Sequence, residues 1–176
     1  MLCASAAAAS STTTMVGDPQ TLTIDVTGQV AGRCGFSAPP VDQAHLGNLE
    51  TPGSMTVDFT VNCNTPFRVR AVSANGGLKT SSVTGDGFTN LLDYSLRLQL
   101  ATDTGALDAT CNADALVSAA GGCAYYGATA GEGLSSGTGV SLNTAGALQF
   151  GWTTAPQRLV AGAYSDTLTI VVEARS

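Results

Sequence analysis

A short acidic motif is the first feature of this sequence that could take part in catalysis. Asp103-Thr104-Gly105-Ala106 follows an alternating apolar run and matches the signature of aspartic proteases. That chemistry needs two carboxylates that share one proton, from two lobes or from two copies of a chain. The sequence has no second Asp-Thr-Gly or Asp-Ser-Gly, so only a homodimer would supply the pair. A strand that ends in a glycine turn explains the same residues, because short motifs often match by accident.

Other residues that could bind a metal or act as a base lack the partners that such chemistry requires. His45 is the single histidine, and a histidine beside a proline-rich turn is usually a surface residue. The spacing of Asp103, Asp108 and Asp114 matches no calcium-binding loop. The five cysteines include no C-x-x-C pair, which argues against a zinc site. We therefore expect a protein that is not an enzyme and that binds no cofactor and no metal.

Disulfide bonds in an exported protein explain the cysteines better. Four paired cysteines allow three connectivities, and the sequence alone does not choose among them. We expect Cys34–Cys63, because each lies at the edge of a strand pattern. We expect Cys111–Cys123, because both lie in one Gly/Ala-rich stretch. In the chain-entropy model each bond contributes roughly 3 to 4 kcal/mol.

The composition favours one exported domain with neither a nucleic-acid partner nor a transmembrane segment. The 176 residues carry a net charge of −6 with a single lysine, Lys79, so no basic patch is available to bind phosphates. No stretch approaches the roughly 20 apolar residues of a membrane-spanning helix. We interpret residues 1–14 as the remnant of a signal peptide, which contains the odd cysteine Cys3, followed by a polar linker.

Apolar residues recur at every second position in five runs, which predicts β-strands with one buried face. Turn-forming residues separate the runs, and no amphipathic helical period lasts three turns. Together these features predict an all-β sandwich. The alternating apolar residues are Met55, Val57, Phe59 and Val61; Phe67, Val69 and Ala71; Leu92, Tyr94, Leu96, Leu98 and Leu100; Leu148, Phe150 and Trp152; and Leu168, Ile170 and Val172.

The stretch from Asp103 to Ala145 interrupts this pattern. It is rich in Gly, Ala, Ser and Thr, and it has room for a short helix at Asp114–Ala120. A loop of this length needs a staple, which the Cys111–Cys123 pair would supply. We therefore treat about residues 103–145 as a disulfide-stapled insertion, with Tyr125-Tyr126 packed back on the domain.

A separate strand-like segment, Thr21–Val30, precedes the first of these runs. Its apolar residues keep a two-residue period, with a glycine on the same face. We interpret the segment as a donor strand that completes another copy of the chain, because a sandwich whose last strand ends the chain can lack an edge partner. Alternatively, the segment is the ordinary first strand of a self-contained sandwich. The residues of this face are Leu22, Ile24, Val26, Gly28 and Val30.

Three runs together resemble the spore coat protein U domain family, which includes the archaic chaperone–usher pilus subunits. They are the strand that ends in Val61-Asn62-Cys63, the run Leu92–Leu96 that leads to Thr102-Asp103, and Ala161–Leu168. The resemblance covers about residues 20–176. The closing strand of the family has a Gly-x-Tyr-x-Asp-x-hydrophobic pattern, and the matching residues here are Gly162, Tyr164, Asp166 and Leu168.

The resemblance implies an immunoglobulin-like sandwich over residues 34–176 that lacks its last strand. A donor segment within residues 15–33 of a neighbouring copy would complete it. The family also has its first disulfide where Cys34–Cys63 would lie. The implied partners are copies of the same chain in a head-to-tail fibre, a periplasmic chaperone and an outer-membrane usher. The implied location is the cell surface, reached through the periplasm, with a role in adhesion and biofilm formation. The alternative is a self-contained secreted adhesin or glycan-binding module.

Overall fold

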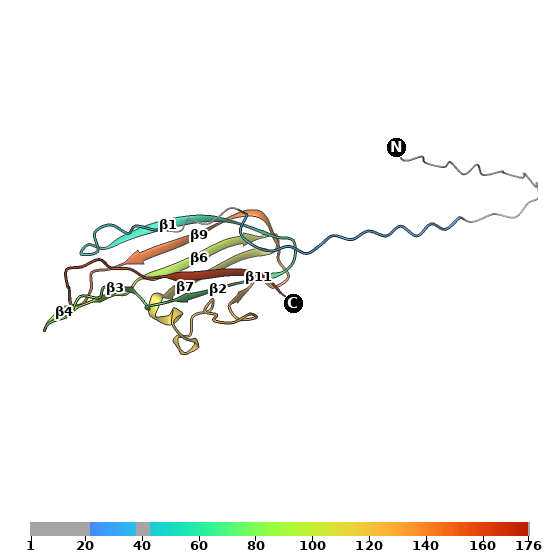
Figure 1. Cartoon of the computed structure of the whole chain (residues 1–176). Helices are drawn as coiled ribbons and strands as arrows, with labels where there is room; N and C mark the ends of the chain where they lie inside the picture. The colour runs from blue at the N-terminus through green and yellow to red at the C-terminus, as the bar shows by residue number, and fades with distance from the viewer. Residues whose placement is uncertain (1–21, 38–42, 176) are drawn as a thin grey trace, which may run out of the picture. The chain divides into compact units, whose positions relative to one another are not determined.

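The computed structural model describes residues 22–37 and 43–175, and the part of the chain from Ala31 onward contains every assigned strand. This part is all-β, with two short 3₁₀ turns, η1 (Ala113–Leu116) and η2 (Ala119–Gly121) (Figure 1). The predicted signal remnant and linker at 1–14, Cys3 and Thr21 lie outside the described residues. The long strands are β1 (Gly53–Cys63), β2 (Phe67–Ser73), β6 (Ser95–Thr102), β7 (Gly105–Asn112), β9 (Ser141–Trp152) and β11 (Leu168–Ala174).

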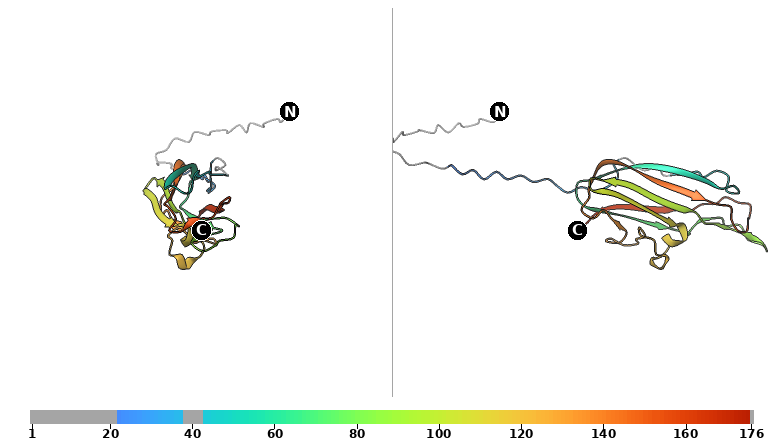
Figure 2. Two further views of the ribbon diagram at one scale, coloured as in Figure 1. Left: turned by 90° about the vertical axis from the view of Figure 1, so that its left-hand side faces the viewer. Right: turned by 180° about the vertical axis from the view of Figure 1, so that it is seen from behind.

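Two sheets contain the long strands. One sheet has the order β1-β9-β6-β7, and the other has the order β11-β2-β8, where β8 is the short strand Leu134–Ser135. All pairings in these two sheets are antiparallel, and the right-hand view of Figure 2 shows the long strands running along the same axis of the domain. Two small ladders lie at one end: β3 (Leu78–Lys79) with β5 (Leu91–Leu92), and β4 (Phe88–Thr89) with β10 (Arg158–Leu159).

The alternation in the sequence produces the core. In β2 the odd-numbered residues Phe67–Ser73 are buried, and in β6 the even-numbered leucines are at most 2 % exposed. Since successive side chains of a strand point to opposite faces, each sheet turns one apolar row inward. The two rows form a single core, whose burial supplies the main driving force for folding.

The predicted insertion is shorter than expected, because its first part is a strand. Gly105–Asn112 forms β7 and pairs along its whole length with β6. The sequence pattern does not reveal this strand, because Leu107 is the one large aliphatic residue of its inward row and Ala109 carries little apolar signal. The predicted short helix at Asp114–Ala120 is present only as the turns η1 and η2. The remaining loop therefore begins after β7 and ends before β9.

This loop, residues 113–140, covers one edge of the second sheet. β8 pairs with Arg68 and Val69 of β2, and Tyr126 forms a parallel bridge with Ala71. Tyr125 is 1 % exposed, and its hydroxyl donates to the carbonyl of Leu96 at 2.5 Å. The prediction that the tyrosine pair packs back on the domain is therefore confirmed for Tyr125.

The predicted strand at Thr21–Val30 is not assigned as a strand in its described part, Leu22–Val30. The side chains of Leu22, Ile24, Val26 and Val30 are 69 to 89 % exposed. A strand exists only as part of a hydrogen-bonded ladder, so an alternating sequence without a paired neighbour does not form one. In the described ranges no helix is long and apolar enough to cross a membrane.

Candidate functional site: an open groove beside the last strand

One edge of β11 has no partner strand within the described chain. On its other side, the N–H of Ala74 donates to the carbonyl of Thr167 at 3.0 Å, and that of Arg175 donates to Pro66 at 2.8 Å. In an antiparallel ladder alternate residues face the same neighbour. The odd-numbered residues of β11 therefore bond to β2. The even-numbered residues, including Ile170 and Val172, direct their N–H and C=O groups to the open edge.

The apolar side chains next to this edge are only half-buried. Leu168, Ile170 and Val172 pack against the core but remain partly exposed, whereas their partners in β2 are fully buried. In β1, Met55 and Val57 are half-buried too, although Phe59, further along the same face, is buried. β11 and β1 belong to different sheets, and no strand covers the apolar side chains between them in the described chain.

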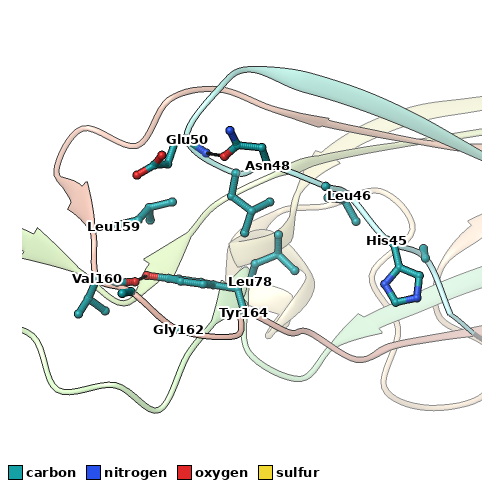
Figure 3. Close-up of a pocket in the computed structure, with 13 residues that line it drawn as sticks. His45, Leu46, Asn48, Glu50, Leu78, Leu159, Val160, Gly162 and Tyr164 are labelled. Carbon is teal, nitrogen blue, oxygen red and sulfur yellow. Dashed lines mark hydrogen bonds between the residues drawn. The ribbon is translucent and has the colours of Figure 1, made fainter.

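A groove lies between these strands. A cavity of about 380 Å³ is bordered by β1 and β9 on one side and by β11 on the other. It shares lining residues with a second cavity of about 550 Å³, shown in Figure 3. We refer to these two cavities together as the groove. The residues that line both are Ala44, His45, Leu46, Leu78 and Tyr164.

The wall opposite the 159–170 segment is irregular chain. Residues 43–50 include no assigned strand, and Leu46 and Leu49 are partly buried against the core. Figure 3 shows His45, Leu46 and Asn48 along this wall, across from Leu159 and Tyr164. A groove with one strand edge and one irregular wall can receive an extended segment that pairs with the strand.

A hydrogen-bond network around Asp166 holds the start of β11. Its Oδ2 accepts from the hydroxyls of Ser73 at 2.6 Å and Tyr94 at 2.7 Å. Its Oδ1 accepts from the backbone N–H groups of Asn75 at 3.0 Å and Thr167 at 2.8 Å. Burial and the neighbouring Asp166 carboxylate raise the pKa of the Tyr94 hydroxyl, so this tyrosine stays a donor. The network ties the chain just before β11 to β2 and to Tyr94, the residue that precedes β6.

The other residues of the predicted closing-strand motif shape the same end of the groove. The hydroxyl of Tyr164 donates to the carbonyl of Val160 at 2.8 Å, and its ring lines both cavities. A Cβ at Gly162 would lie 2.5 Å from the hydroxyl oxygen of Thr80, so a larger residue there would force the Thr80 side chain to shift. Ser165 and Lys79 exchange two backbone hydrogen bonds of 3.0 Å each, while the Lys79 side chain remains exposed. The motif thus builds the wall that precedes β11.

The acidic residues that the sequence offered as candidates for catalysis or metal binding hydrogen-bond to nearby parts of the chain. Asp103 accepts a hydrogen bond from the N–H of Val140 at 2.8 Å, which fastens the β6–β7 turn to the chain before β9. Asp108 forms an exposed salt bridge with Arg97, and hydrogen bonding to that guanidinium lowers the pKa of the carboxyl. No group of three or more His, Cys, Asp or Glu residues able to hold a metal occurs in the described part of the chain. His45 lies on the groove wall.

A Gly-x-Ser-x-Gly pattern at residues 133–137 also has a structural role. A catalytic nucleophile in this pattern sits on a sharp turn between a strand and a helix. Here Ser135 belongs to β8, its hydroxyl accepts from the N–H of Gly137 at 3.1 Å, and the chain continues to a turn. The Ser136 hydroxyl accepts from the N–H of Phe67 and donates to the carbonyl of Gly139. The pattern therefore serves to attach the loop to β2.

Both cysteine pairs that the sequence favoured are joined in the structure, Cys34–Cys63 and Cys111–Cys123. The sequence does not indicate that residues 43–50 form a groove wall, because this role depends on which strand edge stays open.

No family model matches the chain, and no curated protein matches it.

Proposed function

We propose that this protein is a subunit of an extracellular pilus that assembles by donor-strand exchange. In this proposal, Leu22–Val30 of a second copy enters the groove and pairs with the open edge of β11. The observation that carries the proposal is the unpaired β11 edge, with half-buried Leu168, Ile170 and Val172, in a chain that also has an exposed apolar segment of the same period.

The dimensions of the segment and of the edge support this pairing. As a strand, Leu22–Val30 would span about 26 Å and β11 spans about 20 Å, at about 3.3 Å per residue. The excess corresponds to about two residues, which the groove beyond Leu168 can receive. Each apolar side chain moved from water into the groove would contribute about 1.5 to 3 kcal/mol when fully buried.

The resemblance to the spore coat protein U domain family supports the remaining parts of the proposal. The domain is then an immunoglobulin-like sandwich without its last strand, and the donor contact is head-to-tail, which produces an open fibre. An unpaired strand edge beside apolar side chains invites aggregation, so a periplasmic chaperone would cover it before an outer-membrane usher assembles the fibre. Export to the cell surface, adhesion and biofilm formation follow from the same resemblance.

Electron microscopy of purified material tests the proposal. Wild-type chain should form thin fibres, and the triple variant Leu22→Asp, Ile24→Asp, Val26→Asp should not, because three charges would enter an apolar groove. The matched control is Thr23→Asp, Thr27→Asp, Gln29→Asp, which adds the same charge on the opposite face and should still polymerise. A folded wild-type monomer that never assembles would overturn the proposal and favour a secreted binding module.

A further inference from the structure

Residues 31–33, where the N-terminal segment joins the domain, are held next to the end of β1 by Asn64. The side-chain oxygen of Asn64 accepts from the N–H of Arg33 at 2.7 Å, and its amide nitrogen donates to the carbonyl of Ala31 at 2.9 Å. The backbone N–H of Asn64 also donates to the carbonyl of Arg33 at 3.1 Å. Three hydrogen bonds from one residue thus hold residues 31–33.

A covalent bond joins the same two places. Cys34, the next residue of the segment, is linked to Cys63, the last residue of β1. Along the backbone, however, the chain from Cys34 reaches β1 only at Gly53, which is 19 residues later. The disulfide therefore connects Cys34 to the far end of a strand whose near end is separated from it by a long stretch of chain.

In its described part, that intervening stretch is held to the domain mainly by side-chain packing of Phe36, Leu46 and Leu49 and by few backbone hydrogen bonds. Its backbone pairing with β1 is short: the N–H of Asn62 donates to the carbonyl of Gly35, and the N–H of Ser37 donates to that of Thr60, each at 2.9 Å. Residues 43–52 include no assigned strand. Without a further connection between Cys34 and β1, a force applied at Ala31 would separate this stretch from the domain, starting at its N-terminal end.

We propose that Asn64 and the Cys34–Cys63 disulfide form a mechanical anchor, which passes tension from the N-terminal segment directly into the end of β1. This inference rests on the proposed function, because a donor strand held by one copy pulls on the domain to which it belongs. The disulfide carries the tension, and Asn64 positions residues 31–33 so that the pull reaches Cys34 in a set direction. Residues 35–52, which include the groove wall at 43–50, are then excluded from the load.

Force–extension measurement on single fibres tests the anchor. Without the disulfide, the chain from Cys34 to Gly53, 19 residues further on, can straighten to about 65 Å. Because this chain already spans β1, which is about 33 Å long, the added extension is about 30 Å per subunit. Fibres of the double variant Cys34→Ala, Cys63→Ala should show this extra extension at low force, and wild-type fibres should not. The matched control Cys111→Ala, Cys123→Ala removes a disulfide that lies outside the path, and its fibres should extend like the wild type.

The outcomes separate this inference from the proposed function. A wild type that forms no fibres would refute the proposed function and the anchor with it, whereas fibres with equal extension in both double variants would refute the anchor alone. Amide hydrogen exchange covers the case in which the Cys34 variant fails to fold. The Arg33 amide should exchange at least tenfold faster in Asn64→Ala than in the wild type, while Asn64→Asp, which keeps the acceptor, should preserve most of the protection. An Arg33 amide that exchanges at the same rate in all three proteins would contradict the role of Asn64.

Discussion

The two edges of the β11-β2-β8 sheet differ in how the chain covers them. At the β2 edge, β8, the Tyr126 bridge and the buried Tyr125 cover the strand. Arg68 also donates to the carbonyl of Gly133 at 2.9 Å, which holds the loop in place. At the β11 edge, no such cover exists among the described residues, and the apolar side chains stay half-buried. Natural sheets usually protect their edges, and this sheet protects one edge and leaves open the edge that the proposed donor strand would pair with.

The largest expected effect comes from breaking the closed edge. Tyr125→Ala removes a side chain that is 1 % exposed and whose hydroxyl bonds to Leu96. We expect a loss of about 3 to 5 kcal/mol in the free energy of unfolding, because a large cavity remains. Urea denaturation measures this loss. Tyr125→Phe is the control for the hydroxyl alone and should lose about 1 kcal/mol; equal losses in the two variants would contradict a packing role.

A smaller effect is expected from the network that holds β11 against β2. Asp166→Ala leaves the hydroxyls of Ser73 and Tyr94, which are 2 % and 3 % exposed, without their acceptor. Each unsatisfied buried group costs about 1 to 3 kcal/mol, but the two hydroxyls can rotate toward other acceptors, so we expect a total loss of about 2 kcal/mol in the free energy of unfolding. Thermal unfolding measures the total. The matched variant Asp86→Ala removes an exposed carboxyl and should leave the melting temperature unchanged.

At the open edge the expected effect is on binding rather than on folding. Ile170→Ala removes methyl groups that the free domain only half buries, so we expect its stability to fall by about 1 kcal/mol. A synthetic peptide of residues 21–30 should bind the domain that begins at Ala31, and the variant should weaken that binding about tenfold, which corresponds to about 1.4 kcal/mol. Calorimetry gives the dissociation constants. Equal affinities for both proteins would mean that the peptide does not use the groove.

The smallest expected effect is a pH dependence of stability at Asp93, which lies just before β6. Burial, followed by the charge of Asp114, raises the pKa of the Asp93 carboxyl above 3.8. The folded state therefore holds this proton more tightly than the unfolded state does. The resulting stabilisation is present below pH 3.8 and is lost as the pH rises through the folded pKa. Asp93→Asn should flatten this part of the stability–pH curve; a variant curve parallel to that of the wild type would count against the shift.

The strands with strong alternation could be predicted from the sequence, and those with weak alternation could not. Leu96, Leu98 and Leu100 identify β6 without knowledge of its partners, because a large apolar residue at every second position is typical of a strand with one buried face. β7 carries Leu107, Ala109 and Cys111 opposite those leucines, and alanine and cysteine distinguish strand from loop poorly. Its pairing with β6 is the feature that identifies it as a strand.

The groove could be predicted only in part. Leu168, Ile170 and Val172 indicate that one face of β11 is apolar, yet the same alternation would occur in a strand with neighbours on both sides. Whether an edge is open depends on where the loop at 113–140 and the segment at 43–50 lie, and both positions arise from tertiary packing. The sequence likewise could not predict that Asp166 is the centre of a hydrogen-bond network, because its partners Ser73 and Tyr94 are distant in sequence.

The exposed lysine of β3 has a practical consequence. Lys79 is the single lysine of the sequence, and its backbone is fixed to Ser165, immediately before the Asp166 network. Apart from the α-amino group of the N-terminus, an amine-reactive dye or crosslinker therefore modifies one defined side chain, next to the start of the open strand. In an ordered polymer of this chain, every repeat would present the label at the same place, so a single coupling reaction would decorate the filament at regular intervals.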